Sequence, residues 1–447
     1  MQPAGSDRSE ARVPEQPGRP DGEAGASWQW DGEEDGGSEA PEDVVSGGAG
    51  EDGGPRLSRR RLLTGAGVLA AGGAVWAFSR AGGGADPAPP RPRPTRLAGP
   101  EPLWTYRGPE AMTPERLSDR PSRPVFLSRS GLQVLDPATG TPVRTLDFAL
   151  PKTDWPSDVE LSNGRVVIGG DRVYTASNGH VDSRHLTDPA SEWSLPLPEE
   201  LGTGITLFGC DGDLVYGRAM PRPYNGSDNL FAVRYRENVV TWARPSTGSE
   251  RPLTPLTSVG GRVPFFDTST AGTHLVLLET ATGKRLWEMP VEVSLNWAVA
   301  DAEHVYAPAG TAGLRALRLA DGAPRWSVAP GPNEEWRLLP PVSDGTRVYV
   351  PRDDGVVTAY AAATGARLWV HRLPFRLDRR SRPLPAGPTL FVPGPAAAGV
   401  CALDAATGEE RWTFRDSGPG VDVWSLSNDA QRLYAGHDDV LHALPLP

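Results

Sequence analysis

Histidine and cysteine, the residues that most often carry chemistry, are few and widely spaced in this chain of 447 residues. The seven histidines form no HExxH or other metal-ligand spacing, and Cys210 and Cys401 form no CxxC pair. The nearest approach to a metal motif is GHDD at residues 436–439, which has a counterpart in RDDG at residues 352–355. Aspartates between two strand-like runs are ordinary turn residues, and we interpret them so. We therefore predict no catalytic residue and no metal site.

A second group of candidates consists of tryptophans and arginines that stand near the start of successive repeats. Flat indole faces beside fixed positive charge would suit an anionic aromatic molecule or an extended peptide. We expect these residues around the mouth of the central channel of the ring. The alternative is that the indoles merely plug this channel mouth, and both interpretations remain open. The predicted ligand-binding set is Trp155, Trp193, Arg251, Trp297, Trp336, Arg379 and Trp424.

The elements that would position these residues are hairpins with a fixed turn. Segments such as LDAATGEERW (403–412) place a tryptophan four residues after the turn glycine, and the glycines at 283, 322, 365 and 408 are 39, 43 and 43 residues apart. A period in the low forties, with short strands, is typical of β-propellers. Large aromatic residues at regular spacing usually pack in a core. We assign a structural role, packing between blades, to Trp104, Trp242, Trp287, Trp326, Trp369 and Trp412.

The repeats predict an all-β fold, an eight-bladed propeller of four-stranded antiparallel blades over residues 103–447. Hairpin turns are expected near residues 140, 179, 237, 283, 322, 365 and 408. The last repeat ends before its fourth strand, whereas LWTYR (103–107) resembles an outer strand without its first three. We therefore expect this N-terminal strand to close the last blade. The two cysteines would then lie about four blades apart, too far for a disulfide.

The repeat A-x-D/A-A-x-T-G-x-x-x-W resembles the tryptophan-docking motif of pyrroloquinoline quinone (PQQ)-like β-propellers, strongly from residue 275 onward and weakly before it. The resemblance implies the fold, whereas that family contains quinoprotein dehydrogenases, outer-membrane assembly scaffolds and exported propellers of other kinds. The dehydrogenases hold PQQ with calcium, and many have adjacent cysteines, which this chain lacks. We predict no cofactor, with PQQ and calcium only in the alternative of an oxidoreductase.

The N-terminal part differs sharply in composition. Residues 1–55 contain 14 acidic and 3 basic residues, so this Gly/Pro/Glu-rich head carries the whole net charge of −11 and is expected to be disordered. Residues 56–80 resemble a twin-arginine signal or membrane anchor, with an uncharged run at 62–78, and residues 81–102 form a Pro/Gly-rich linker. The basic flank predicts a cytoplasmic head and a propeller outside the cytoplasm.

The sequence favours a non-catalytic, exported or membrane-anchored binding or scaffold propeller. Its partner would be a small ligand or a cell-envelope protein at the channel mouth. Because basic residues form no stripe alternating with aromatics, nucleic-acid binding is disfavoured. The alternatives are a quinoprotein oxidoreductase and an envelope-assembly scaffold or sensor ectodomain.

Overall fold

The computed structural model describes one compact unit of the chain. The described residues are 98–112, 122–148, 166–177, 179–221, 228–246, 249–252, 258–269, 272–291, 297–309, 313–329, 337–418, 420 and 422–447. The predicted head, the signal or anchor segment and residues 81–97 of the linker lie outside this set. Within it, no helix has the length and apolar character needed to cross a bilayer.

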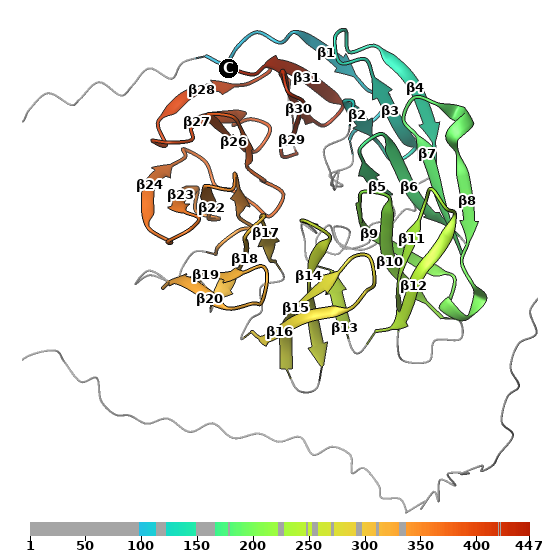
Figure 1. Ribbon diagram of the computed structural model, residues 1–447. Coiled ribbons are helices and arrows are strands. Elements are labelled where there is room, and N and C mark those ends of the chain that lie inside the picture. The colour runs from blue at the N-terminus through green and yellow to red at the C-terminus, as the bar shows by residue number, and fades with distance from the viewer. Residues whose placement is uncertain are drawn as a thin grey trace, which may run out of the picture. The chain divides into compact units, whose positions relative to one another are not determined.

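The described strands form eight antiparallel sheets that follow one another around a ring (Figure 1). We number these blades 1 to 8 in chain order. Blade 1 contains β2 (Val125–Leu127), β3 (Gly131–Leu135) and β4 (Pro142–Asp147). Blade 2 contains β5 (Val166–Gly169), β6 (Arg172–Ser177), β7 (His180–His185) and β8 (Trp193–Pro196). Blade 3 contains β9 (Gly204–Asp211), β10 (Leu214–Met220), β11 (Asn229–Arg234) and β12 (Val239–Pro245). Blade 4 contains β13 (Ser249–Pro252), β14 (Arg262–Ser269), β15 (Gly272–Glu279) and β16 (Arg285–Pro290).

The other four blades repeat this plan. Blade 5 contains β17 (Val299–Ala300), β18 (His304–Ala309), β19 (Gly313–Arg318) and β20 (Pro324–Val328). Blade 6 contains β21 (Val342–Ser343), β22 (Arg347–Pro351), β23 (Val356–Ala361) and β24 (Arg367–Arg372). Blade 7 contains β25 (Leu384–Ala386), β26 (Thr389–Pro393), β27 (Val400–Asp404) and β28 (Glu410–Phe414). Blade 8 contains β29 (Ser425–Asn428), β30 (Arg432–His437), β31 (Val440–Pro445) and β1 (Trp104–Arg107).

The core lies between blades. The second and third strands of a blade are buried on both faces, as in β26 and β27, because each blade is packed between two neighbours. The outer strands alternate largely between partly buried and exposed residues, so that only one face contributes to the core. Stability therefore depends on how well each outer strand contacts the next blade.

Blade 8 is closed by the two ends of the propeller, as the sequence predicts. β1 pairs antiparallel with β31, with Trp104 opposite Ala443 and Arg107 opposite Val440. Arg107 also forms an ion pair with Asp439 at 2.8 Å. This confirms the eight-bladed propeller and its closure by the N-terminal strand.

One predicted hairpin is assigned wrongly. The turn at Gly179 joins β6 to β7 in the middle of blade 2, whereas the outer hairpin of that blade runs from His185 to Trp193. This longer connection contains the short 3-10 helix η1 (Pro189–Ser191), which Asp188 caps. A second 3-10 helix, η2 (Glu199–Leu201), leads into blade 3. An Asn-Gly turn suits either hairpin of a blade, so its local sequence does not distinguish them.

Candidate functional site

The outer-strand tryptophans dock onto the following blade. The indole of Trp326 covers Gly365 so closely that a Cβ there would lie 2.6 Å from the ring, and its N–H donates to Ala362 O at 2.7 Å. Trp369 makes the same contacts with Gly408 and Ala405 O. The same arrangement recurs at Trp104, Trp242 and Trp287. A turn glycine is required here both for its positive φ and for the flat surface it offers to the ring.

A tyrosine and an aspartate support several of these indoles from within the same blade. The ring centroid of Tyr306 lies 5.9 Å from that of Trp326 and 5.8 Å from that of His304. Its hydroxyl donates to Asp301 Oδ2 at 2.6 Å. Blade 6 repeats the contact between Tyr349 and Asp344. Burial would raise the pKa of Asp301, but hydrogen bonds from Tyr306 and nearby backbone groups outweigh it and lower the pKa. These groups therefore act in packing.

Three blades lack the contact of an indole with a turn glycine. Trp412 of blade 7, predicted to dock, lies near no described glycine and instead has its ring centroid 5.6 Å from that of Phe391 in the same blade. Arg144 occupies the docking position of β4 and donates to the His185 carbonyl at 2.5 Å, beside an ion pair with Glu192. In blade 2, Trp193 lies on the outer strand opposite Ser183 and stacks on Tyr235 at 6.4 Å. Trp193 thus occupies the docking position on an outer strand, and its predicted place at the channel mouth, in an interblade loop or at the start of an innermost strand, is wrong.

Two of the predicted channel-mouth indoles are buried between blades. Trp424 has no exposed surface, donates to Ala396 O of blade 7 at 3.0 Å, and lies 4.2 Å from the His437 ring. Trp297 is 4% exposed and packs with Leu338 in the core shared by blades 5 and 6. In this structure neither indole presents a face to a ligand.

The remaining members of the predicted set contribute little to a described site. Arg379 is exposed in the loop between blades 6 and 7. Its neighbour Arg380 makes the contacts there, since it donates to Asp378 at 3.1 Å and to Asp422 at 2.5 Å in the next interblade loop. Arg251 lies on β13, but its side chain is outside the described residues, as are Trp155 and Trp336. A ring of all seven residues is therefore not assembled among the described parts.

A buried polar network joins blades 7 and 8. Asp416 Oδ2 accepts from His437 Nε2 at 2.8 Å and lies 3.3 Å from His442 Nε2, while His437 Nδ1 lies 2.7 Å from Asp438 Oδ2. Burial lowers the pKa of His442, although Asp416 opposes this effect. Thr105 Oγ1 lies 2.9 Å from Nδ1 of His442, which connects the network to β1. The network therefore reinforces the closure of the ring. From the sequence we singled out only the GHDD segment of this network, and we interpreted its aspartates as turn residues.

Three side chains capable of binding a metal converge in blades 6 and 7. One ligand atom each of His371, Cys401 and Glu410 lies within 4.8 Å of the other two, and the described residues contain no second group of this kind. The three stand 30 and 9 residues apart, so no short motif reveals them. Cys401 is buried, and neither it nor Cys210 forms a disulfide. Burial lowers the pKa of His371, against opposing effects of Glu410 and the Gly408 backbone.

A small apolar cavity lies beneath Trp242, between blades 3 and 4. Its walls include Phe208, Phe265 and Leu278, and it leaves little enclosed space. The cavity lacks converging polar groups of the kind that orient a ligand. We interpret it as incomplete packing under a docked indole.

Comparisons with known proteins agree with this architecture. A family profile described as "Outer membrane protein assembly factor BamB" matches residues 271–415 and 312–443. No curated protein sequence matches the chain.

Solved structures of similar fold have low sequence identity. The computationally designed Ika8 protein is 14% identical, covers 77% of this chain and 99% of its own, and has a TM-score of 0.54. The C-terminal WD40 domain of Sif2 is 9% identical, with coverage of 78% and 99% and a TM-score of 0.53. Sqt1 of Saccharomyces cerevisiae is 11% identical, with coverage of 78% and 100% and a TM-score of 0.51. At these identities the three show the fold alone.

The profile match falls on blades 4 to 8, where the glycine-docked tryptophans are most regular. The repeat, the docking geometry and the profile match agree that residues 271–443 are similar to the PQQ-like β-propeller family.

Proposed function

We propose that this propeller is a non-catalytic scaffold of the cell envelope that binds an extended segment of a protein partner along β24. The observation that carries the proposal is the outer edge of blade 6. Leu368 is 47% and Val370 53% exposed, and β24 alone among the described strands exposes two large apolar side chains. Apolar groups on an open strand edge favour pairing with another chain.

The hydrogen-bonding state of β24 supports the same interpretation. It is the last strand of its sheet and pairs only with β23 among the described strands. On the neighbouring blade, an extended segment already lies against the outer strand. Ala98 forms a parallel bridge with Thr413 of β28, and Gly99 N donates to Thr413 O at 2.9 Å. The outer edge of a blade in this propeller is therefore able to accept an added strand.

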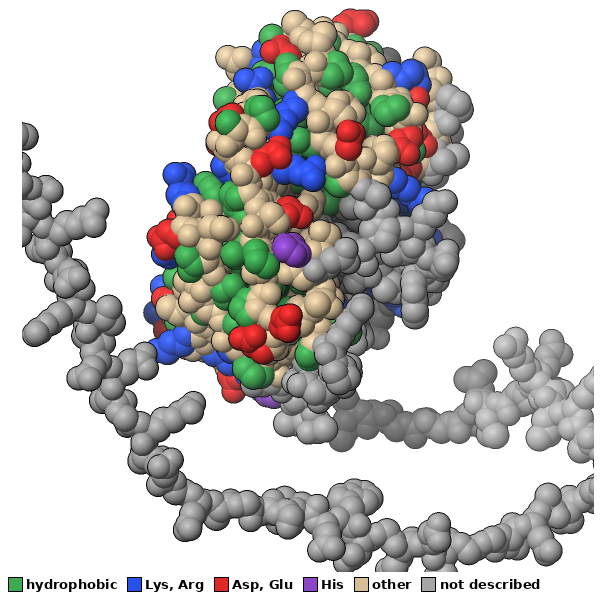
Figure 2. Space-filling view, turned by 90° about the vertical axis from the view of Figure 1, so that its right-hand side faces the viewer, with side chains coloured by type: hydrophobic (Ala, Val, Ile, Leu, Met, Phe, Trp, Pro, Cys, Tyr) green, Lys and Arg blue, Asp and Glu red, His purple; other side chains and the backbone are tan. Residues whose placement is uncertain are grey.

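The burial of the predicted channel-mouth indoles bears on the kind of partner. On the side of the molecule shown in Figure 2, positive, negative and apolar side chains all reach the surface. Because Trp297 and Trp424 are buried, a small ligand held by stacked indoles has less support than a protein partner. The description of the matching family profile, an assembly factor of the outer membrane, supports a role in assembly.

Photocrosslinking in cells tests the proposal. A photoreactive phenylalanine at Val370 should capture one discrete envelope protein, whereas the same group at Ser327 should not. Ser327 is the matched control because it is exposed and follows the docking tryptophan of β20, as Val370 does in β24. The double variant Leu368→Arg, Val370→Ser gives β24 the arginine and serine that flank the docking tryptophan of β20 in blade 5. It should therefore fold normally and no longer bind the partner. Equal capture at both positions, or an undiminished partner in the double variant, would overturn the proposal.

We further propose that the Arg-flanked segment at 56–80 delivers the propeller out of the cytoplasm through a twin-arginine route. That receptor reads the arginine pair rather than charge, so replacing Arg59 and Arg60 by lysine should block export. The measurement is the protease accessibility of the propeller in spheroplasts. Normal export of the double variant would instead favour a simple positive-inside anchor.

A further inference from the structure

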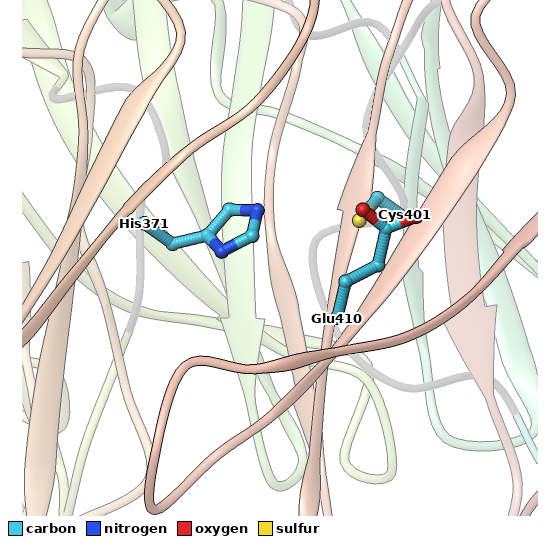
Figure 3. A group of neighbouring side chains, drawn as sticks. All are labelled: His371, Cys401 and Glu410. Carbon is cyan, nitrogen blue, oxygen red and sulfur yellow. The ribbon is translucent and has the colours of Figure 1, made fainter. Parts of the chain in front are cut away.

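We propose that His371, Cys401 and Glu410 form a binding site for one divalent transition-metal ion of the zinc class, at the joint between blades 6 and 7. Figure 3 shows the imidazole of His371 directed toward the Cys401 sulfur and the Glu410 carboxylate, with one ligand atom of each within 4.8 Å of the others. The three residues come from β24, β27 and β28. A bound ion would therefore join two blades.

Strand geometry explains why all three side chains face the same joint. His371 stands two residues after Trp369 on β24, so it lies on the face that docks onto blade 7. On β27, Cys401 and Leu403 both belong to the core cluster shared with blade 6. A register shift beside Leu403 places Glu410 opposite it, so this bulge sets Glu410 on the blade 6 side.

Two neighbouring groups orient the ligands. Thr413 Oγ1 donates to Glu410 Oε1 at 2.7 Å, and Thr413 pairs with Cys401 across the two strands. The backbone of Gly408 lies close enough to His371 to raise the pKa of its imidazole, against the effect of burial. Metal-binding histidines usually have such a backbone or carboxylate partner on the second ring nitrogen, because it fixes the orientation of the ring. Gly408 is itself held beneath Trp369, so the docking contact also positions the candidate site.

The donor set selects the class of metal. A thiolate with an imidazole and one carboxylate suits zinc and similar ions, and disfavours calcium and magnesium, which prefer oxygen ligands. Metal–ligand bonds of about 2.0–2.3 Å place tetrahedral ligand atoms roughly 3.3–3.8 Å apart. Atoms that already lie within 4.8 Å reach that spacing by small side-chain rotations. Three protein ligands leave a fourth position for water.

Cobalt substitution of the full-length chain tests the site without any assay of activity. Co²⁺ reports a thiolate ligand through a sulfur-to-metal charge-transfer band, and we expect this band with about one equivalent bound. Cys401→Ser should abolish the band, whereas Cys210→Ser, which alters a buried cysteine on β9, should leave it intact. Thr413→Val should weaken Zn²⁺ binding about 10- to 100-fold through the loss of its hydrogen bond to Glu410. Zn²⁺ should also raise the thermal midpoint of the wild type, because it binds the folded state.

If Cys401→Ser does not fold, the isosteric variant Glu410→Gln provides a second test of the metal site. It should lower Zn²⁺ affinity and keep the charge-transfer band at saturating Co²⁺. The proposal is overturned if the wild type shows no thiolate band, if the band survives Cys401→Ser, or if Glu410→Gln and Thr413→Val bind Zn²⁺ as tightly as the wild type.

Discussion

The joints that blades 5 and 6 make with the next blade differ in their contacts from the joints that blades 1 and 2 make with the next blade. In blades 5 and 6 an indole covers a turn glycine of the next blade and donates to a carbonyl of the same turn. At the joint from blade 1 to blade 2, Arg144 reaches the His185 carbonyl without an indole, and Trp193 stacks on Tyr235 at the next joint. The first design buries an indole against a turn glycine, whereas Arg144 relies on polar contacts and only Trp193 keeps an aromatic one. Burial of apolar surface contributes more to the free energy of unfolding than a partly exposed ion pair does. The joints among blades 5 to 7 should therefore be more stable than the joint between blades 1 and 2.

The largest expected effect concerns the joint made by the chain ends. A chain that begins at Pro109 loses β1 and with it the Trp104 contact to Gly140. The exposed edge of β31 should then cause aggregation and loss of a cooperative transition. Size-exclusion chromatography and thermal melting check this, and a monodisperse chain with an unchanged transition would refute the closure.

The two joint designs are compared directly by two alanine variants. Trp326→Ala should lower the free energy of unfolding by about 3–5 kcal/mol, because it removes a large packed ring and leaves a cavity. Arg144→Ala should cost about 1 kcal/mol, since it removes hydrogen bonds and a partly exposed ion pair. Chemical denaturation measures both. Similar losses at the two positions would show that the designs do not differ in strength.

The glycine beneath the indole gives a finer test. Gly365→Ala should cost about 3 kcal/mol, because the new methyl group meets the Trp326 ring in addition to the strain of a positive φ. Gly387 is the matched control, with a φ of +57° and no atom near its missing Cβ. Gly387→Ala should cost only about 1 kcal/mol. If both variants lose the same amount, close docking of the indole contributes nothing.

The smallest effect is electrostatic and concerns the turn of blade 7. A hydrogen bond from Arg411, followed by those from Thr407 and Ala406, lowers the pKa of Asp404 to about 2 from its usual 3.8. A lowered carboxyl pKa stabilises the fold above about pH 4, and this contribution disappears as the pH falls toward 2. The thermal midpoint of Asp404→Asn should therefore lie below that of the wild type at neutral pH and approach it in acid. A gap that is unchanged by acid would exclude this charge effect.

The ring and its closure follow from the sequence because the glycine–tryptophan spacing is a local feature that repeats with each blade. The outer hairpin of blade 2 could not be predicted in this way, because it has no turn glycine. The Asn-Gly turn of this blade joins another pair of strands. The direction of Trp297 and Trp424 depends on packing against a neighbouring blade, which spacing does not encode. His371, Cys401 and Glu410 meet across three strands, and a bulge sets the last of them. No sequence motif marks such a meeting.

Hydrogen exchange measured by mass spectrometry tests most directly whether docked indoles set local stability. Backbone amides in the inner strands of the strongly docked blades should open only with global unfolding, whereas weakly docked blades should open locally. We predict slower exchange in β18, β19, β22 and β23 than in β6 and β7. Equal protection in the two sets, or faster exchange in blades 5 and 6, would contradict the difference drawn between the two kinds of joint.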